Sequence, residues 1–184
     1  MIAPDKASKI IFPVEWRKVL LDHCVRKYHE QYQTDETHER KAYGLIGGTQ
    51  EGETIRVGGV FALKKNRRFD EEYIKYMTEM MTEYAVESKT PFEKRGWVAT
   101  PEEVMKIYTE CDRLKIHQFG TYHMHLVPWE HDTIRDTCTE IDTALAEGSN
   151  TVMFIVSMVD LNRPIIRAFY DGGNDREIPI DFPG

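Results

Sequence analysis

The hydrophobic and polar positions along the chain follow two periods, which predict a mixture of helices and strands. Four stretches place apolar side chains at helical spacing. These stretches are residues 13–32, 70–87, 100–115 and 132–147. Thr100 is expected to cap the third helix, with Pro101 at its first position and Glu103 returning the capping bond. Gly148 is expected to end the fourth helix.

Shorter apolar runs between these helices are typical of strands. They are "AYGLIGG" (42–48), "ETIRVGGVFALKK" (53–65), "IHQFGTYHMH" (116–125), "TVMFIVSMV" (151–159), "PIIRAFYDG" (164–172) and "EIPIDF" (177–182). The order of helices and strands predicts an α/β fold with a mixed central sheet flanked by helices. A chain of 184 residues is expected to form a single domain, residues 1–184.

Composition excludes some classes of function. The formal net charge of -7 argues against nucleic acid as a partner, because phosphate contacts need clustered Lys and Arg. No apolar stretch approaches the roughly 18 residues of a membrane span, and the N-terminus lacks the usual apolar signal region. Cys24, Cys111 and Cys138 do not suggest a disulfide framework, so we expect a cytoplasmic protein.

The stretch "GTYHMHLVPWEHDTIRDTC" (120–138) carries candidate metal ligands. Side chains alternate along a strand, so His123 and His125 face the same way and can reach one cation. Asp136 follows in the first turn of the expected helix, and a loop could fold it back to them. Two histidines and one aspartate would leave a fourth position open, as in catalytic zinc sites. Alternatively, Thr133-x-x-Asp136 is a helix capping box that needs no metal.

The spacing His123-x-His125, seven residues, Thr133, two residues, Asp136 resembles the signature of the JAMM/MPN+ (JAB domain) zinc metalloprotease family. "YGLIGG" (43–48) is similar to that family's Gly-rich strand, and "VMFIVSMVDLNRPIIRAFY" (152–170) to its last strand pair. The resemblance covers about residues 13–181. It implies the JAB/MPN (cytidine-deaminase-like) fold, with the helix at 70–87 as an insertion.

The resemblance also implies a function. His123, His125 and Asp136 would bind zinc, and the hydroxyl of Thr133 would support the oxyanion of an attacked amide. The expected activity is a metallopeptidase or isopeptidase that hydrolyses amide bonds at the C-terminus of a ubiquitin-like or sulfur-carrier protein.

The chain departs from the family at the general base. The family has a glutamate three residues before the glycine that opens the Gly-rich strand, and here that residue is Lys41. A protonated lysine cannot accept a proton. Glu39, two residues earlier, faces the same way on an extended segment and is the candidate replacement. Glu36 and Glu130 are further carboxylates that could approach.

Two other classes of function stay open. Lys41 favours a catalytically impaired MPN-like scaffold that acts through protein–protein interaction. A zinc hydrolase of small amides is the third hypothesis. Its deaminase version is disfavoured, because the His-x-Glu and Pro-Cys-x-x-Cys signature is absent from the sequence.

Overall fold

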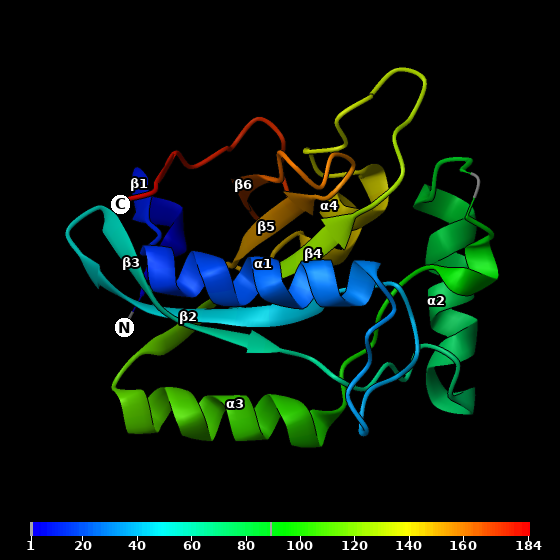
Figure 1. Cartoon of the computed structure of the whole chain (residues 1–184), viewed down its shortest axis with the longest axis horizontal. Coiled ribbons are helices and arrows are strands. Elements are labelled where there is room, and N and C mark those ends of the chain that lie inside the picture. Colours follow the sequence, from blue (N-terminus) through cyan, green and yellow to red (C-terminus); the bar gives the residue numbers. More distant parts are fainter. Residues whose placement is uncertain (1, 89) are drawn as a thin grey trace.

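A seven-stranded mixed sheet forms the centre of the molecule (Figure 1). The computed structural model describes residues 2–88 and 90–184. The strands are β1 (Lys9–Ile11), β2 (Tyr43–Glu51), β3 (Thr54–Ala62), β4 (His117–His125), β5 (Val152–Ser157), β6 (Ile165–Tyr170) and β7 (Ile180–Asp181). Their order across the sheet is β6-β5-β4-β2-β3-β1-β7. The β4–β5, β1–β3 and β1–β7 pairs are parallel, and the other pairs are antiparallel.

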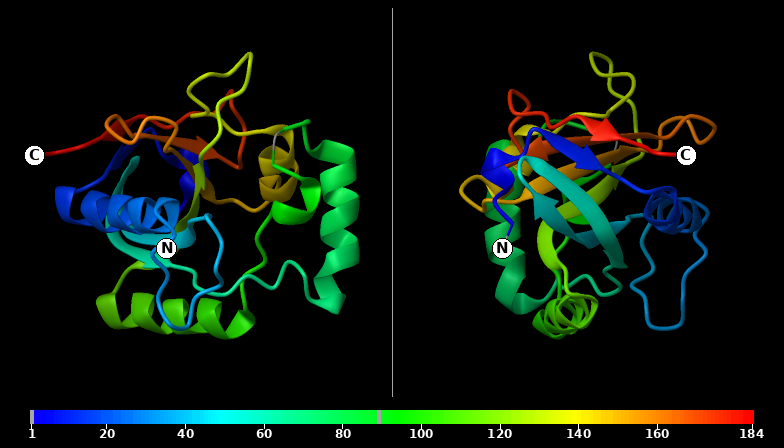
Figure 2. Two further views of the ribbon diagram at one scale, coloured as in Figure 1. Left: turned by 45° about the vertical axis from the view of Figure 1, so that its right-hand side comes forward. Right: turned by 90° about the vertical axis from the view of Figure 1, so that its left-hand side faces the viewer.

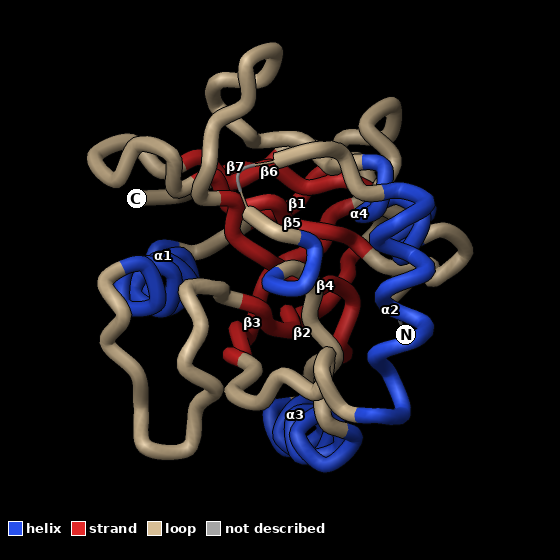
Figure 3. The backbone as a smooth tube through the Cα atoms, turned by 90° about the vertical axis from the view of Figure 1, so that its right-hand side faces the viewer, coloured by secondary structure: helices blue, strands red, loops and turns tan. Residues whose placement is uncertain are grey.

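Helices cover both faces of this sheet. They are α1 (Val14–Tyr28), α2 (Glu71–Tyr84), α3 (Pro101–Leu114) and α4 (Glu140–Ala146), with short 3-10 turns at Pro4–Lys6 and Phe92–Lys94. Seen along the sheet, α1 lies on one side of the strands and α2 and α4 lie on the other (Figure 3). Two further views show α3 below the strands, lengthwise in the left view and nearly end-on in the right view (Figure 2).

The alternation of side chains along β4 separates two kinds of environment. Tyr122 and Met124 point into the main core under α1, together with Leu20 and Cys24 of that helix. His123 and His125 point to the opposite face, where α3 and α4 pack through separate apolar clusters. The histidines therefore lie on the face that these two helices share.

Close packing explains the Gly-rich start of β2. A Cβ atom at Gly44 would collide with the Tyr122 ring and with the carbonyl of Phe61. The absence of a side chain at Gly44 lets β2 pair closely with β4, with Tyr43 opposite His123. The Gly-rich strand thus brings an aromatic ring against the first histidine.

The sequence-based expectation of an α/β fold with a mixed sheet and flanking helices is confirmed. The helix expected at 70–87 is α2. At the third helix, Thr100 accepts the capping bond from the Glu103 N–H. The Glu103 carboxylate accepts hydrogen bonds from the Thr100 hydroxyl and from the backbone N–H groups of Lys64 and Lys65.

Two expectations about element boundaries are wrong. Residues 132–139 are not helical, and α4 begins only at Glu140. The reason is tertiary: Arg135 has a left-handed φ of 46°, and neighbouring strands bind the carbonyls of this segment. The first helix, expected at 13–32, ends at Tyr28, and the residues before it form β1, in which Ile10 is fully buried.

Within the described residues, no helix is both long and apolar enough to cross a membrane. Cys24, Cys111 and Cys138 are buried free thiols.

Candidate metal centre

The end of β4 presents two imidazoles to one point in space. His123 and His125 are the last residues of the strand on this face, and they are only 5% and 7% exposed. Their Nε2 atoms lie 3.0 Å apart. Tyr43 stacks on the His123 ring at 5.1 Å between centroids, and Trp97 stacks on Tyr43 at 5.2 Å. This aromatic stack fixes the plane of the first imidazole.

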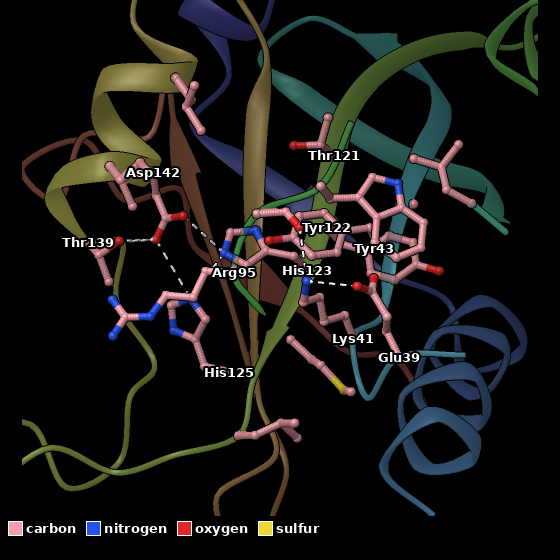
Figure 4. A pocket seen from close by; sticks show the side chains of 18 of the residues that line it. Glu39, Lys41, Tyr43, Arg95, Thr121, Tyr122, His123, His125, Thr139 and Asp142 are labelled. Carbon is pink, nitrogen blue, oxygen red and sulfur yellow. Dashed lines mark hydrogen bonds and ion pairs between the residues drawn. The ribbon is translucent and has the colours of Figure 1, made fainter. Parts of the chain in front are cut away.

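Asp142 completes a cluster with the two histidines. Its Oδ1 lies 3.2 Å from the Nε2 of His123, and its Oδ2 lies 3.6 Å from the Nε2 of His125 (Figure 4). Tetrahedral ligands 2.0–2.1 Å from one ion are about 3.3 Å from each other. The three side chains therefore have the spacing and the donor types of a three-ligand metal site. The cluster could hold a metal ion.

The first turn of α4 holds Asp142 in place. Thr139 is the N-cap of α4, and Asp142 is the third residue of the helix. The Asp142 Oδ2 accepts hydrogen bonds from the Thr139 backbone N–H at 2.8 Å and from the Thr139 hydroxyl at 2.7 Å. One carboxylate thus caps a helix and faces two imidazoles.

The second histidine is oriented from its other ring nitrogen. The Nδ1 of His125 lies 3.1 Å from the backbone carbonyl of Arg135, to which it donates as Nδ1–H. This tautomer leaves the Nε2 lone pair free for a metal, as in many protein metal sites. Ser157, at the end of β5, donates a hydrogen bond to the carbonyl of Ile134 and fixes the same loop.

Burial and mutual charge govern titration in the cluster. Burial lowers the pKa of His125, only partly offset by its hydrogen bond to Asp142. Burial alone would raise the pKa of Asp142, but the neighbouring imidazoles hold it well below its usual range. Both shifts favour the deprotonated forms that bind a cation.

One predicted metal ligand, Asp136, and one predicted catalytic residue, Thr133, do not lie in the cluster. Asp136 does not join the histidines; its Oδ1 lies 3.3 Å from the guanidinium of Arg167, which draws it towards β6. Thr133 is exposed in the loop between β4 and α4 and does not line the cavity beside the cluster. Both changes follow from the extended course of the segment that was expected to be helical.

The missed residues, Thr139 and Asp142, had a signal in the sequence. Thr139-x-x-Asp142 repeats the pattern of Thr133-x-x-Asp136 six residues later. Its Ile141, Leu145 and Ala146 have helical spacing directly after the cap. A helix that started at the second copy would have placed Asp142, instead of Asp136, in the first turn.

Glu39 and Lys41 lie in the same cavity as the cluster. Continuing the β2–β4 register by two residues places Lys41 opposite His125, on the same face of the sheet. The Lys41 Nζ lies 3.3 Å from Glu39 and donates to the Gly96 carbonyl at 3.2 Å. Glu39 also accepts from the side chain of Asn66 at 2.8 Å. Burial lowers the pKa of Lys41, and the charge of Glu39 partly opposes this change.

The other two carboxylates do not approach the cluster. Glu36 is buried at the end of α1, where it pairs with Arg26. Glu130 is exposed in the β4–α4 loop. Glu39 is thus the sequence-predicted carboxylate that shares a cavity with the histidines.

The cavity in front of the cluster is large. Its volume is about 1140 Å³, and its wall includes Tyr43, Trp97, Trp129 and the cluster itself. A space of this size exceeds a single bound water and suits an organic ligand or a chain segment. The fourth coordination position of an ion in the cluster would therefore be open to a ligand.

Comparison with known proteins supports the fold only. No family model and no curated protein matches the chain. Among solved structures, it is similar to the solution structure of protein DSY2949 from Desulfitobacterium hafniense, a target of the Northeast Structural Genomics Consortium. The TM-score is 0.52 at 16% sequence identity, covering 95% of this chain and 92% of that chain. The fold and cluster define a mixed α/β protein with a buried His-His-Asp site.

Proposed function

We propose that this protein is a zinc-dependent metallopeptidase of the JAMM type. The observation that carries the proposal is the spacing of the His123, His125 and Asp142 ligand atoms, which suits a tetrahedral ion with one open position. Two imidazoles and one carboxylate are an established zinc donor set. The pattern Thr139-x-x-Asp142 also resembles the second half of the family signature. Thirteen residues separate it from His125, where the signature has seven.

The finer fold assignment belongs to the same proposal. In the JAB/MPN fold, as the resemblance implies it, a central strand delivers the His-x-His pair and the following helix delivers the aspartate. Strand β4 and helix α4 have this arrangement here. The helix α2 would be the insertion between the second strand and the helix before the histidines.

Each residue of the site has a distinct task in this proposal. Zinc bound by the cluster would act as a Lewis acid and lower the pKa of a coordinated water towards neutrality. Thr139 and the Arg135 carbonyl orient two of the ligands. Glu39 accepts the proton from the attacking water, and Lys41 and Asn66 hold its carboxylate in place. The expected substrate is an amide bond at the C-terminal tail of a ubiquitin-like or sulfur-carrier protein.

The metal content of purified variants tests the ligand assignment. We expect about one zinc per chain in the wild type, loss of zinc in Asp142→Asn, and retention in Asp136→Asn. The second variant is a matched control, because Asp136 is equally buried but contacts Arg167. Zinc retained in Asp142→Asn and lost in Asp136→Asn would identify Asp136 as the third ligand in place of Asp142.

Hydrolysis of a ubiquitin-like protein with a C-terminal extension tests the activity. We expect zinc-dependent cleavage after the tail, at a rate reduced by at least about 100-fold in Glu39→Gln, as for removal of a general base. The zinc content of this variant should stay unchanged. Cleavage that persists after chelation and dialysis would count against a metallopeptidase.

One observation favours a second candidate function, a non-catalytic MPN-like scaffold. The ammonium of Lys41 occupies the family's base position, and both oxygens of Glu39 already accept hydrogen bonds. A zinc-loaded protein that cleaves neither tails nor small amides, and that captures a stable partner, would establish this alternative. Loss of cleavage in Glu39→Gln would exclude it.

A further inference from the structure

The cavity beside the metal cluster has an unusual charge for this protein. The whole chain carries a formal net charge of -7. Five basic residues nevertheless line the cavity among the described residues, against three acidic ones. The basic residues are Arg40, Lys41, Lys94, Arg95 and Arg135, and the acidic ones are Glu30, Glu39 and Asp142. A cavity of opposite sign to its protein focuses a field that attracts anions.

The acidic groups closest to the cluster already have partners. Asp142 accepts bonds from Thr139 and faces the two histidines. Glu39 is bound by Lys41 and Asn66. Among the described residues, neither carboxylate forms an ion pair with Arg95 or Arg135.

Arg135 is the least satisfied of these arginines. Its backbone carbonyl holds His125, so its side chain starts next to the metal cluster. The guanidinium lies 3.5 Å over the centre of the Trp129 ring, and its Nε is buried without a hydrogen-bond partner. Burial lowers the pKa of this arginine. A buried guanidinium donor without an acceptor is costly and calls for an anion.

Arg95 approaches from another segment of the chain. Its Nε and one terminal nitrogen donate to the carbonyls of Thr90 and Val86, at 2.7 Å each, which fixes the side chain. Burial lowers the pKa of Arg135; the charges of Asp142 and Asp132 oppose this change, and the charge of Arg95 adds to it. Figure 4 shows the Arg95 side chain extending beside Asp142 and His125. Arg95 and Arg135 line the same cavity, and guanidinium groups suit a carboxylate as their acceptor.

We propose that Arg95 and Arg135 bind a carboxylate of the substrate next to the metal cluster, so that the site selects amides with a carboxylate near the scissile bond. This inference rests on the proposed function. A planar guanidinium binds a carboxylate through two parallel hydrogen bonds, which gives orientation as well as affinity. The carboxylate is either the C-terminal α-carboxylate or an acidic side chain.

Binding of three small probes tests the proposal. N-acetyl-glycyl-glycine has a free α-carboxylate, and its C-terminal amide has no carboxylate. The third probe, N-acetyl-glycyl-aspartic acid α-amide, has only a side-chain carboxylate. Calorimetric titrations should use the zinc-loaded protein and the protein after chelation and dialysis. We expect at least one carboxylate probe to bind about tenfold or more tightly than the neutral amide in both forms.

Three variants distinguish carboxylate binding by Arg95 and Arg135, here called the arginine clamp, from a general attraction by positive charge. Arg95→Gln and Arg135→Gln should each weaken carboxylate binding about tenfold or more, with little change for the neutral amide. Arg135→Lys should keep part of the affinity, because it keeps the charge but not the planar pair of donors. The control is Arg163→Gln, an exposed arginine between β5 and β6. Melting temperatures of all variants should confirm that they are folded.

The outcomes are distinguishable from failure of the proposed function. Equal binding of charged and neutral probes would overturn the clamp, and so would a carboxylate preference that Arg95→Gln and Arg135→Gln both leave unchanged. If this unchanged preference were seen only in the zinc-loaded protein, the metal ion would be the group that binds the carboxylate. Absence of zinc would overturn the metallopeptidase, while the clamp would still be measured in the metal-free protein.

Discussion

Two histidines on opposite faces of the sheet, His125 and His23, are buried for different reasons. His125 has a partner at each ring nitrogen, and its position at the end of β4 serves the metal cluster. The Nδ1 of His23 lies 2.7 Å from the Tyr122 hydroxyl under α1, but its Nε2 is buried without a partner. A neutral imidazole tolerates this environment better than an imidazolium, which would need a counter-charge.

The titration of His23 should make stability depend on pH. Burial, with the nearby charge of Arg26, lowers the pKa of His23 from 6.5 to about 4. Between these values the unfolded chain binds a proton that the folded chain excludes. The stabilisation is therefore present above pH 6.5 and lost as the pH falls towards 4, by about 3 kcal/mol in total.

His23→Gln isolates this contribution. Urea unfolding of the metal-free wild type and variant at pH 7, 6, 5 and 4 should show a steeper loss for the wild type. The titration of Glu36, whose pKa is lowered from 4.5 to about 2, lies mostly below this window and is common to both proteins. Parallel curves for the two proteins would show that His23 titrates at its ordinary pKa.

At the scale of elements, the first turn of α4 joins stability to metal binding. The Thr139 hydroxyl donates to the Asp142 carboxylate, which also accepts from the cap N–H. Residues that orient a metal ligand typically contribute a factor of about 10–100 to affinity. Loss of a cap residue typically costs about 1 kcal/mol. Thr139 should therefore influence both quantities.

Substitution of Thr139 tests this coupling. Thr139→Ala should weaken zinc binding about 10–100-fold in a competition titration and lower the free energy of unfolding by about 1 kcal/mol. Thr139→Ser, which keeps the hydroxyl, should stay close to the wild type. Thr133→Ala is the matched control, because Thr133 is exposed in the loop between β4 and α4. An equal effect of Thr133→Ala would show that Thr133, the residue expected from the sequence, supports the metal site instead.

Sequence periodicity predicts the elements of this fold better than it predicts its loop geometry. The helix at 71–84 and the strand with its two histidines follow from local patterns, which tertiary contacts leave unchanged. The segment before α4 contains two copies of Thr-x-x-Asp, and local pattern alone does not choose between them. The choice depends on distant residues: Arg167 binds Asp136, and Asn174 binds both backbone groups of Cys138. These partners are invisible to a local pattern.

At the scale of the whole molecule, the sheet separates two groups of buried charges. The metal cluster lies on one face, between α4 and the start of β2. At the end of α1, Arg26 and Glu36 form a two-point ion pair, and the buried Lys27 lies 3.9 Å from the same carboxylate. Lys27 also donates to the carbonyl of Thr37 at 3.0 Å. This second group of charges stabilises the segment between α1 and β2, in which Glu39 and Lys41 line the cavity.

Removal of the charge on Glu36 should destabilise the fold without altering the metal ligands. Glu36→Gln leaves the fully buried ammonium of Lys27 without its counter-charge, and breaking a buried pair in this way typically costs about 3–5 kcal/mol. Asp35→Asn is a matched control in the same connection, because its pair with Lys64 is exposed and contributes little to stability. Urea unfolding at pH 7 measures both changes. Zinc stoichiometry of folded Glu36→Gln should equal that of the wild type, since Glu36 lies outside the cavity of the cluster. A loss below about 1 kcal/mol for Glu36→Gln would show that Thr37 alone satisfies Lys27.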